Sequence, residues 1–577
     1  MPSRGMQLLS RTACTTFAAV SPGRIIHAYR SQRYSPGLSI KLLTTRLYSN
    51  AAGSKDAISF EDIGVHPVVV KSLHAAFPNV RNPTETQCEF IPQVLSGNNI
   101  LLKDGTGTGK SFGLILALLS KPRVEQPNSA RSSGRSSNRA AITSLVLVPH
   151  RDLAYQLYHW IEAILAKSSS SNSNLHNVVQ MLIRGASVSI QDQISRLHEM
   201  PPHVLVGTPQ AVQEVFNKDR TALRLDSLST VVVDEADYLI DAVPRFANKY
   251  MQEKARMKIQ RHPGPTRLLL DYIYNKKQTS AKDGVEHRGP QLIMTSATFR
   301  WEYREEVRKF GWFQGPTVKV TGTSSIPSSK DAISSSHAPA LVHCCLVVSP
   351  DGKISNIEGA VEPQAPPSDD VRGGTEFPDE VFQVKDEDVD ETFQPKLDDD
   401  LRKKFVTNPS PFNPAALEAV AAAFALDVPR LALLVLPAKA DVKRAVFELQ
   451  QLGVSAIALD LLGDQGRTYL LNGDASTPVD NPALLVSKPA STRGLDLPEL
   501  SHVFMLGLPE DRGVDNYLHV AGRAGRFGRG GKVVTILDER WEVTGPDGKV
   551  VVHDDPRRFA IILRKIGTVP TKMEHFA

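Results

Sequence analysis

The stretch Asp104-Gly105-Thr106-Gly107-Thr108-Gly109-Lys110-Ser111 decides the fold of this chain. An apolar run over 100–102 precedes it and another over 112–119 follows it, which predicts a strand, a glycine-rich turn and a helix. Such a turn can wrap a polyphosphate, because glycines let backbone N–H groups approach the oxygens and the helix N-terminus adds partial positive charge. Lys110 can reach the β- and γ-phosphates, and the Ser111 hydroxyl can bind Mg²⁺. The strict Walker pattern has glycine six positions before the lysine, where this chain has Asp104.

The length and composition of the chain limit the classes of protein to which it can belong. The 577 residues are enough for two to four domains, and 41% hydrophobic residues are typical of a soluble globular protein. A formal net charge of +5 permits a nucleic-acid partner without requiring one. The four cysteines have neither zinc spacing nor a disulfide framework, which excludes those two classes of small scaffold.

The first 55 residues contain no aspartate or glutamate, and their arginines and lysines are interleaved with serine, threonine, leucine and isoleucine. This composition predicts a mitochondrial transit peptide over 1–55. The stretch Arg46-Leu47-Tyr48-Ser49 resembles a matrix-protease site, which places the protein in the matrix. The alternative is a disordered basic arm that contacts RNA. No apolar run is long enough to span a bilayer, so we expect no membrane span.

Downstream of the glycine-rich turn, apolar strands alternate with helical segments, which predicts an α/β fold with an open parallel sheet. Each strand ends at a polar cluster. Ligands of such sheets bind beyond the carboxyl ends of the strands, so these clusters are candidate site residues. The alternative for any one of them is an ordinary capped loop. The strands and the clusters that follow them are 144–148 with 149–156, 178–183 with 184–185, 204–207 with 208–209, and 230–233 with 234–237.

Asp234 and Glu235 end a buried apolar strand. A carboxylate in that place can hold Mg²⁺, and its neighbour can orient and deprotonate an attacking water. Upstream, Gln87 can both donate to and accept from an adenine edge. Alone, the acidic pair would be a solvated turn and Gln87 a helix-surface residue; together with the phosphate loop they predict an NTP-hydrolysing site.

The ordered series of motifs resembles the DEAD-box family of ATP-dependent RNA helicases. The match covers about Phe60 to Leu537. The motifs that carry it are Gly107-Thr108-Gly109-Lys110-Ser111, Pro149 to Gln156, Asp234-Glu235-Ala236-Asp237, Ser296-Ala297-Thr298, Thr492-Arg493-Gly494-Leu495-Asp496 and Tyr517 to Arg526. Within the family, the basic arm and the altered last motif are similar to a fungal mitochondrial helicase that assists large-ribosomal-subunit assembly.

The resemblance implies two tandem RecA-like domains that close on ATP, Mg²⁺ and single-stranded RNA, with sequence-independent backbone contacts to the RNA. It implies catalytic roles for Lys110, Asp234, Glu235 and the arginine fingers Arg523 and Arg526. Nucleotide contacts would come from Phe60, Gln87, Thr106, Gly107, Thr108, Gly109, Lys110, Ser111 and Asp496, with Ser111 and Asp234 on the metal. RNA contacts would come from Arg151, Gly185, Thr208, Pro209, Arg493 and Gly494, and coupling from Ser296, Thr298 and His519.

Domain boundaries follow from composition. We expect an N-terminal RecA-like domain over 56–321, a Ser/Pro-rich linker over 322–340 and a C-terminal RecA-like domain over 341–577 with an acidic disordered insert at 363–400. The basic stretch around 245–287 is longer than a simple connection needs. It is either an RNA- or ribosome-contacting insert or a solvated helical excursion.

Three departures from the family pattern concern domain coupling and RNA grip: Val520, Lys488 and Gln210-Ala211. Two hypotheses remain open. The first is a monomeric mitochondrial ATPase that locally remodels RNA, with ribosomal RNA and large-subunit precursors as partners. The second is an ATP-switched RNA clamp with little turnover, which Val520 and Lys488 would favour.

Overall fold

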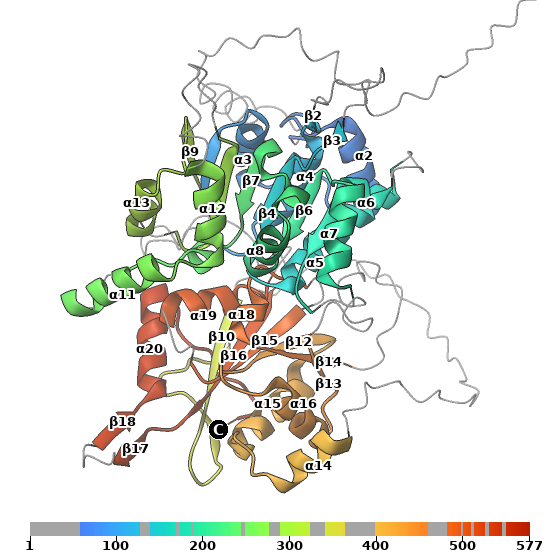
Figure 1. Cartoon of the computed structure of the whole chain (residues 1–577). Helices are drawn as coiled ribbons and strands as arrows, with labels where there is room; N and C mark the ends of the chain where they lie inside the picture. Colours follow the sequence, from blue (N-terminus) through green and yellow to red (C-terminus); the bar gives the residue numbers. More distant parts are fainter. Residues whose placement is uncertain are drawn as a thin grey trace, which may run out of the picture. The chain divides into compact units, whose positions relative to one another are not determined.

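The computed structural model describes residues 58–126, 139–168, 174–185, 188–243, 248–275, 289–299, 301–322, 341–363, 399–459, 482–497, 500–508, 513–525, 530–544 and 550–576 (Figure 1). The segment expected to be the transit peptide (1–55) lies outside these ranges. So do the expected linker, apart from residue 322, and the expected acidic insert, apart from residues 363, 399 and 400. The compact unit begins at Ile58.

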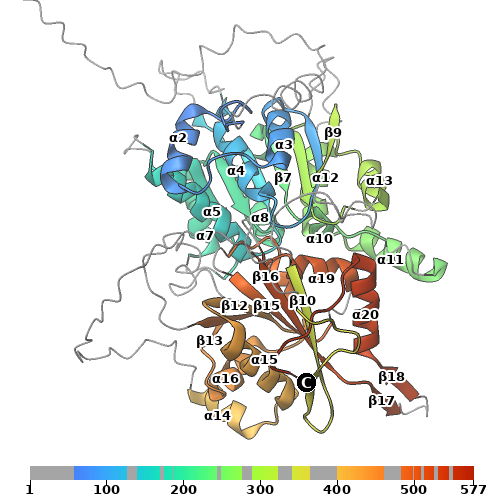
Figure 2. The same cartoon turned by 180° about the vertical axis from the view of Figure 1, so that it is seen from behind.

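The first sheet has seven strands in the order β5-β6-β4-β7-β8-β1-β9, and every neighbouring pair is parallel. Helices lie on both of its faces (Figures 1 and 2). The strands are β1 (Asn99–Lys103), β4 (Ser144–Leu147), β5 (Val179–Leu182), β6 (Val204–Gly207), β7 (Thr230–Val233), β8 (Gln291–Ser296) and β9 (Thr317–Thr321). The helices are α2 (Pro67–Ala76), α3 (Glu85–Leu95), α4 (Lys110–Ser120), α5 (Arg151–Ala166), α6 (Leu175–Val178), α7 (Ile190–Glu199), α8 (Pro209–Lys218), α9 (Arg220–Leu223), α10 (Ala236–Leu239), α11 (Lys249–Arg261), α12 (Pro265–Asn275) and α13 (Trp301–Lys309). A short antiparallel pair joins β2 (Glu125–Gln126) to β3 (Arg139–Ala140).

The second sheet also has seven strands, in the order β11-β10-β16-β15-β12-β14-β13, and only its edge pair β10–β11 is antiparallel. Its strands are β10 (Leu341–Val348), β11 (Ile354–Asn356), β12 (Leu431–Val435), β13 (Ala456–Ala458), β14 (Ala483–Ser487), β15 (Leu500–Leu506) and β16 (Gly531–Asp538). The helices are α14 (Asp399–Thr407), α15 (Pro414–Asp427), α16 (Val442–Gln451), α18 (Pro489–Thr492), α19 (Gly513–Ala521) and α20 (Asp555–Ile566), and a hairpin joins β17 (Trp541–Thr544) to β18 (Val550–His553). The predicted α/β class with two parallel sheets is confirmed.

In the first domain, alternating side chains of the strands lie in two hydrophobic clusters. Ile100 and Leu102 of β1 lie in one cluster of the first domain, whereas Leu101 lies in the other. Such alternation buries both faces of the sheet, because successive side chains of a strand point to opposite faces. Polar groups are therefore confined to the strand ends. The order β6-β4-β7-β8-β1 brings five of those ends side by side, which is why motifs far apart in the sequence can meet.

The described part of the stretch 245–287 contains two helices, α11 and α12, which differ in burial. On α12, Leu269, Leu270, Ile273 and Tyr274 are buried in the core of the first domain. None of the residues of α11 is buried. Exposure of α11 fits both alternatives for this stretch, whereas a solvated excursion is wrong for α12, because α12 carries an apolar stripe that its charged surroundings hide in the composition.

His203 makes the first domain sensitive to acid. Its Nε2 donates to the Leu118 carbonyl at 3.0 Å, and its buried Nδ1 makes no hydrogen bond with any described residue. Burial lowers the pKa of His203 to about 4. Between that value and the unfolded pKa of about 6.5, the unfolded chain binds the proton and the folded one does not, so stability falls as pH falls through this window.

We expect this histidine to contribute a loss on the order of 2–3 kcal/mol between pH 7 and pH 4. Urea unfolding at several pH values measures it. The variant His203→Gln should show a shallower dependence on pH than the wild type, whereas His262→Gln, at an exposed position, should not. Equal slopes for wild type and His203→Gln would contradict the assignment.

Candidate active site

The phosphate loop, residues 104–111, connects β1 to α4. Gly107 and Gly109 have φ of 80° and 79°, a backbone conformation that glycine adopts without strain. The loop thus turns back over the start of α4, where Lys110 is only 7% exposed and donates from Nζ to the Asp104 carbonyl at 3.0 Å and to the Gly105 carbonyl. Burial lowers the pKa of Lys110 against the opposing pull of nearby carboxylates. The loop therefore holds a cation at the N-terminus of a helix, where anions bind.

Asp104 stands where the Walker pattern has glycine, and its side chain holds the phosphate loop in place through hydrogen bonds. Its carboxylate accepts from Thr86 Oγ1 at 2.5 Å and from the Gly105 N–H at 2.7 Å, and the side chain is 3% exposed. The departure from the Walker pattern thus ties the loop to α3 while its backbone still turns as the pattern requires.

Gln87 occupies the third position of α3 and uses both ends of its carboxamide within the protein. Its Oε1 accepts from the Thr84 N–H at 2.9 Å, and its Nε2 donates to the Gly109 carbonyl at 2.9 Å. Thr84 Oγ1 adds a bond to the Thr108 carbonyl at 3.0 Å. The structure thus shows Gln87 fastening the phosphate loop to α3, and its contact with adenine stays a prediction.

The acidic pair lies at the end of β7, two strands away from β1. Ser111 Oγ donates to Asp234 Oδ2 at 2.6 Å, and Thr295 Oγ1 donates to Asp234 Oδ1. Burial, reinforced by the charge of Glu235, raises the pKa of Asp234. Glu235 has φ of 53°, an uncommon backbone conformation for a residue with a side chain and one that clusters at functional sites.

The donors present fit a nucleotide with its magnesium ion. A hydroxyl and a carboxylate 2.6 Å apart are hard oxygen ligands of the kind that Mg²⁺ prefers. Glu235 Oε2 is buried and makes no hydrogen bond with any described residue. A buried, unpaired carboxylate oxygen is costly, so it marks a place where another polar group binds.

Thr298, Asp237 and His519 link the acidic turn to the second domain. Thr298 Oγ1 donates to Asp237 Oδ2 and lies 3.4 Å from His519 Nε2, and His519 Nδ1 lies 3.9 Å from Glu235 Oε2. Although burial alone would raise the pKa of Asp237, His519 and Thr298 hold it well below its usual range. Ser296 contributes a bond from the Thr298 N–H at 2.9 Å. The three predicted coupling residues thus meet in one cluster.

The second domain also approaches the phosphate loop. A Cβ atom added to Gly522 would lie 1.7 Å from Thr106 Oγ1, so the backbone of Gly522 is in close contact with the Thr106 side chain. The next residue, Arg523, is 3% exposed, donates to the carbonyls of His519 and Leu495, and contributes to lowering the pKa of Lys110. Arg523 thus follows directly on the residue that contacts the phosphate loop, and its action on a bound phosphate stays a prediction.

Gly522→Ala should lower the RNA-stimulated ATPase rate by about tenfold or more, because the new methyl group would push Thr106 away and open the contact that a closed site needs. Steady-state ATPase assays with saturating RNA measure this. The matched control is Gly513→Ala, at the first residue of α19, the helix that ends just before Gly522. An added Cβ at Gly513 meets Ile562 at an ordinary 3.7 Å. Equal activity of the two variants would show that the Thr106 contact does not matter for turnover.

The predicted RNA contacts of the first domain lie at one edge of the sheet, after β4, β5 and β6. A Cβ atom on Gly185 would lie 3.7 Å from Arg151 Nη1, which makes these two residues neighbours. Thr208 is the N-cap of α8, with Pro209 at the first helical position, and the Thr208 N–H donates to the Leu182 carbonyl at 3.1 Å. The structure thus brings these four together, while their binding of RNA stays a prediction.

Two predicted site residues of the second domain, Arg493 and Asp496, bond to residues of the first domain for which the sequence predicted no role. His150 Nε2 donates to the Arg493 carbonyl at 2.6 Å, and Gln156 bonds both the N–H and the carbonyl of Asp496, at 3.0 and 3.1 Å. Burial lowers the pKa of His150 to about 4, so it bonds as a neutral ring. The sequence analysis includes His150 and Gln156 only as members of the motif from Pro149 to Gln156 and predicts no contact for either of them.

Arg493 and Gly494 complete this set. The guanidinium of Arg493 lies 4.8 Å from the ring centre of Tyr238 and donates to Asn516 Oδ1 at 2.7 Å. Gly494 has φ of 71°, and an added Cβ would lie 2.5 Å from Leu153 Cδ2. Tyr238 and Asn516 were missed, because only the fold brings an exposed tyrosine beside the arginine.

One predicted site residue lies in the core, and another cannot be placed because it is not among the described residues. Phe60 is fully buried in a core cluster and packs edge-on against His74, with ring centres 6.5 Å apart. This correction makes Phe60 a core residue, because a ring with no exposed surface offers no face to a base. Arg526 lies outside the described residues.

Val520 and Lys488 differ in their surroundings. Val520 is 2% exposed within the core of the second domain, whereas Lys488 caps α18 without a side-chain bond. The valine is therefore a packing residue here.

None of the described helices has the length and apolarity needed to cross a membrane.

Two parallel sheets, a phosphate loop, an acidic strand end and a buried arginine from a second domain together define a two-domain RecA-like nucleoside triphosphatase. Comparison with known proteins narrows this class. Residues 84–307 match the family model described as DEAD/DEAH box helicase, and residues 443–528 match that of the helicase conserved C-terminal domain.

Similar proteins carry the same family name. The chain is 26% identical to DEAD-box ATP-dependent RNA helicase 47A of Oryza sativa subsp. japonica over 79% of this chain and 67% of the relative. It is 26% identical to the ATP-dependent RNA helicase mss116, mitochondrial, of Aspergillus fumigatus over 33% of this chain and 28% of that protein. The fold resembles S. cerevisiae Dbp5 bound to RNA and ADP BeF3, with a TM-score of 0.50 at 17% identity, over 89% of this chain and 95% of that one. Both matched segments and these relatives show that the chain is similar to the DEAD-box RNA helicases.

Proposed function

We propose that this protein hydrolyses ATP in an RNA-dependent manner and uses the cycle to remodel structured RNA in mitochondria. The observation that carries the proposal is a pair of contacts made by the phosphate loop: Ser111 Oγ donates to Asp234 Oδ2 at 2.6 Å, and Thr106 packs against the backbone of Gly522. Lys110, Glu235 and Arg523, three residues from distant parts of the sequence, are the chain neighbours of these contacting residues. Each is buried, and their charges suit the phosphates, the attacking water and the transferred group respectively.

In this proposal the loop N–H groups and Lys110 hold the β- and γ-phosphates of ATP, and Ser111 and Asp234 hold Mg²⁺. When bound, the ion would neutralise charge on the phosphates. Glu235 Oε2, which makes no hydrogen bond with any described residue, accepts the proton of the attacking water. Arg523, joined by Arg526, stabilises the charge that develops on the transferred phosphoryl group. Asp496 contacts the ribose.

RNA binding would favour the same arrangement. Arg151, Gly185, Thr208 and Pro209 would hold the RNA backbone in the first domain, and Arg493 and Gly494 in the second. The bonds from His150 to Arg493 and from Gln156 to Asp496 join the two sets. RNA that contacts both sets stabilises the contact between Thr106 and Gly522, and hydrolysis follows from closure.

Mitochondrial action in ribosomal RNA or large-subunit assembly is the finer part of the proposal. The acid-free, arginine-containing composition of residues 1–55 supports it, as does the mitochondrial designation of the Aspergillus fumigatus relative. Organelle crosslinking followed by sequencing of the attached RNA tests it. Recovery of large-subunit ribosomal RNA is the expected result, and recovery of only cytosolic RNA would contradict it.

The ATPase assay tests the main proposal. Purified full-length protein should hydrolyse ATP slowly alone and many-fold faster with single-stranded RNA, and it should separate a short duplex only with ATP. A hydrolysis rate that ignores RNA would contradict the enzyme function. The second candidate, an ATP-switched RNA clamp, is favoured by the loss of an arginine at Val520. It predicts slow RNA release and less than one turnover during each binding event.

A further inference from the structure

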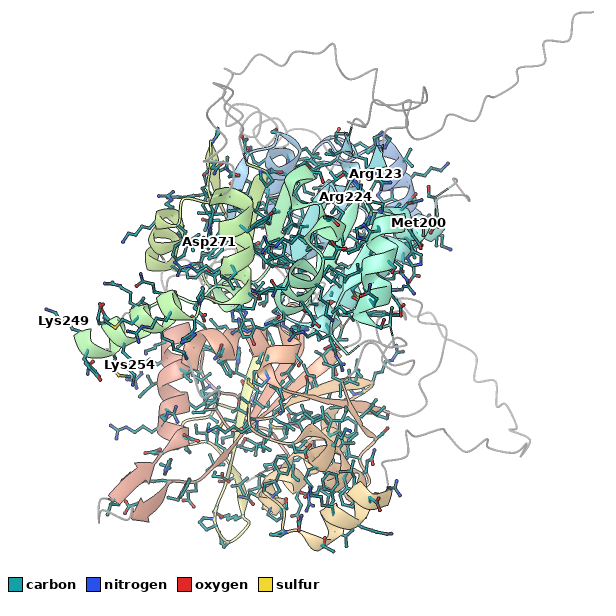
Figure 3. The ribbon with its side chains drawn as sticks, in the orientation of Figure 1. Arg123, Met200, Arg224, Lys249, Lys254 and Asp271 are labelled. Carbon is teal, nitrogen blue, oxygen red and sulfur yellow. The ribbon has the colours of Figure 1, made fainter. Side chains whose placement is uncertain are left out.

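The helix α11 presents a basic surface that the proposed site does not use. It has five basic residues and one acidic residue, a net charge of +4 over 13 residues. The basic residues are Lys249, Lys254, Arg256, Lys258 and Arg261, and the acidic one, Glu253, lies 3.4 Å from Arg256. Lys249 and Lys254 project away from the ribbon (Figure 3).

One face of α11 points toward the protein and the opposite face toward solvent. The half-buried residues Gln252, Ala255 and Ile259 recur at helical spacing and form the inner face. The outer face, defined by the exposed residues Tyr250, Lys254, Met257, Lys258 and Arg261, alternates cations with large apolar side chains. Tyr250 is 73% exposed and Met257 48%. A helix face that served only solubility would not need an exposed tyrosine and methionine between its lysines.

The position of α11 is fixed by a cap at its N-terminus and by the helix that follows it. Asn248 caps its N-terminus, accepting from the Met251 N–H at 2.8 Å. The helix that follows, α12, is anchored by buried Leu269 and Tyr274 and by the bond from Trp312 Nε1 to Asp271 at 2.8 Å. A helix of 13 residues without a buried side chain gains nothing from the core and is marginal alone. The cap and the anchored neighbour keep the outer face in a fixed direction.

The chemistry of the outer face suits the RNA backbone. Lys254, Lys258 and Arg261 follow one another at one helical turn, with about 5–6 Å between neighbouring Cβ atoms, which makes a row of cations for successive phosphates. Tyr250, at the N-terminal end of the row, offers a ring on which an unpaired base can stack. A purely acidic protein partner would suit the charge but would leave Tyr250 and Met257 without a defined contact.

We propose that the outer face of α11 is a second RNA-binding surface, which holds RNA that extends beyond the strand in the proposed catalytic site. The choice of RNA as the partner rests on the proposed function. The outer face of α11 adds affinity for structured RNA without contributing to hydrolysis, because α11 supplies no residue to the nucleotide site.

The test compares two RNAs. One is a single strand of about ten nucleotides, long enough for the catalytic site alone. The other is the same strand joined to a hairpin stem. Binding to full-length protein is measured by fluorescence anisotropy at several salt concentrations, with RNA-stimulated ATPase measured in parallel. The variants are the triple substitution Lys254→Gln, Lys258→Gln and Arg261→Gln, and the single substitution Tyr250→Ala. The control removes three exposed positive charges elsewhere: Arg557→Gln, Arg564→Gln and Lys565→Gln on α20.

We expect the α11 triple variant to bind the extended RNA roughly tenfold more weakly, with a salt slope reduced by about two, while its affinity for the short strand and its kcat stay unchanged. Tyr250→Ala should weaken binding of the extended RNA without changing the salt slope. The α20 control should behave as wild type. Unchanged affinity for the extended RNA would overturn the inference, as would an equal loss for both RNAs. Loss of a protein partner with RNA binding intact would also overturn it. An absence of RNA stimulation in the wild type would instead reject the proposed function.

Discussion

The variant Glu235→Gln is expected to lose RNA-stimulated ATP hydrolysis by about 10³-fold while it still binds ATP and RNA. Glutamine keeps the size and shape of the side chain but cannot accept a proton from water. Lys110, Ser111 and the loop N–H groups are unchanged, so the nucleotide should bind as before. Single-turnover hydrolysis and fluorescent-nucleotide binding measure the two quantities separately.

The matched control is Glu199→Gln, which removes one exposed carboxylate from the same domain and should leave the rate unaltered. A Glu235→Gln rate within a few-fold of wild type would mean that another group activates the water. Loss of nucleotide affinity in the same variant would mean that Glu235 helps to hold the nucleotide instead.

The variant Arg523→Ala should lower kcat by about 10³-fold with little change in the ATP affinity of the first domain, because the guanidinium comes from the second domain and acts on the developing charge. Arg523 also donates to the Leu495 carbonyl at 2.8 Å, so part of the loss could come from a disturbed loop. Arg523→Lys separates the two contributions: it keeps the charge but not the planar fork of donors.

For Arg523 we expect both variants to unfold near the wild-type temperature and both to hydrolyse slowly, with the lysine variant the less impaired. Steady-state kinetics with saturating RNA and thermal unfolding provide these data. Near-wild-type turnover in Arg523→Ala would remove the arginine from the catalytic set and leave it as a structural residue of the second domain.

Local signals were sufficient for much of the site. The strand, glycine-rich turn and helix around Lys110 follow from adjacent residues, and the position of Asp234 follows from an apolar strand that ends in polar residues. Ser296 was predicted only from the family resemblance. Because parallel strands place their carboxyl ends at one edge, a one-dimensional pattern predicts which of these residues meet.

The contacts that depend on tertiary packing could not be predicted in the same way. No pattern in the sequence places Thr106 against Gly522, or His150 against Arg493, because each contact joins residues more than 340 positions apart. Phe60 was assigned to the nucleotide site from its position in the motif order, but burial depends on which side of a loop packs on the core. Similarly, the charge of 245–287 concealed that α12 carries the core stripe.

The central claim is that Lys110 and Arg523 act on the same terminal phosphate while RNA is bound. A crystal structure of the full-length protein with a non-hydrolysable ATP analogue, Mg²⁺ and single-stranded RNA tests it most directly. The account predicts that Lys110 Nζ and the Arg523 guanidinium both contact the γ-phosphate, with Ser111 and Asp234 at the metal. A structure in which RNA and nucleotide are both bound but Arg523 lies far from the γ-phosphate would contradict it.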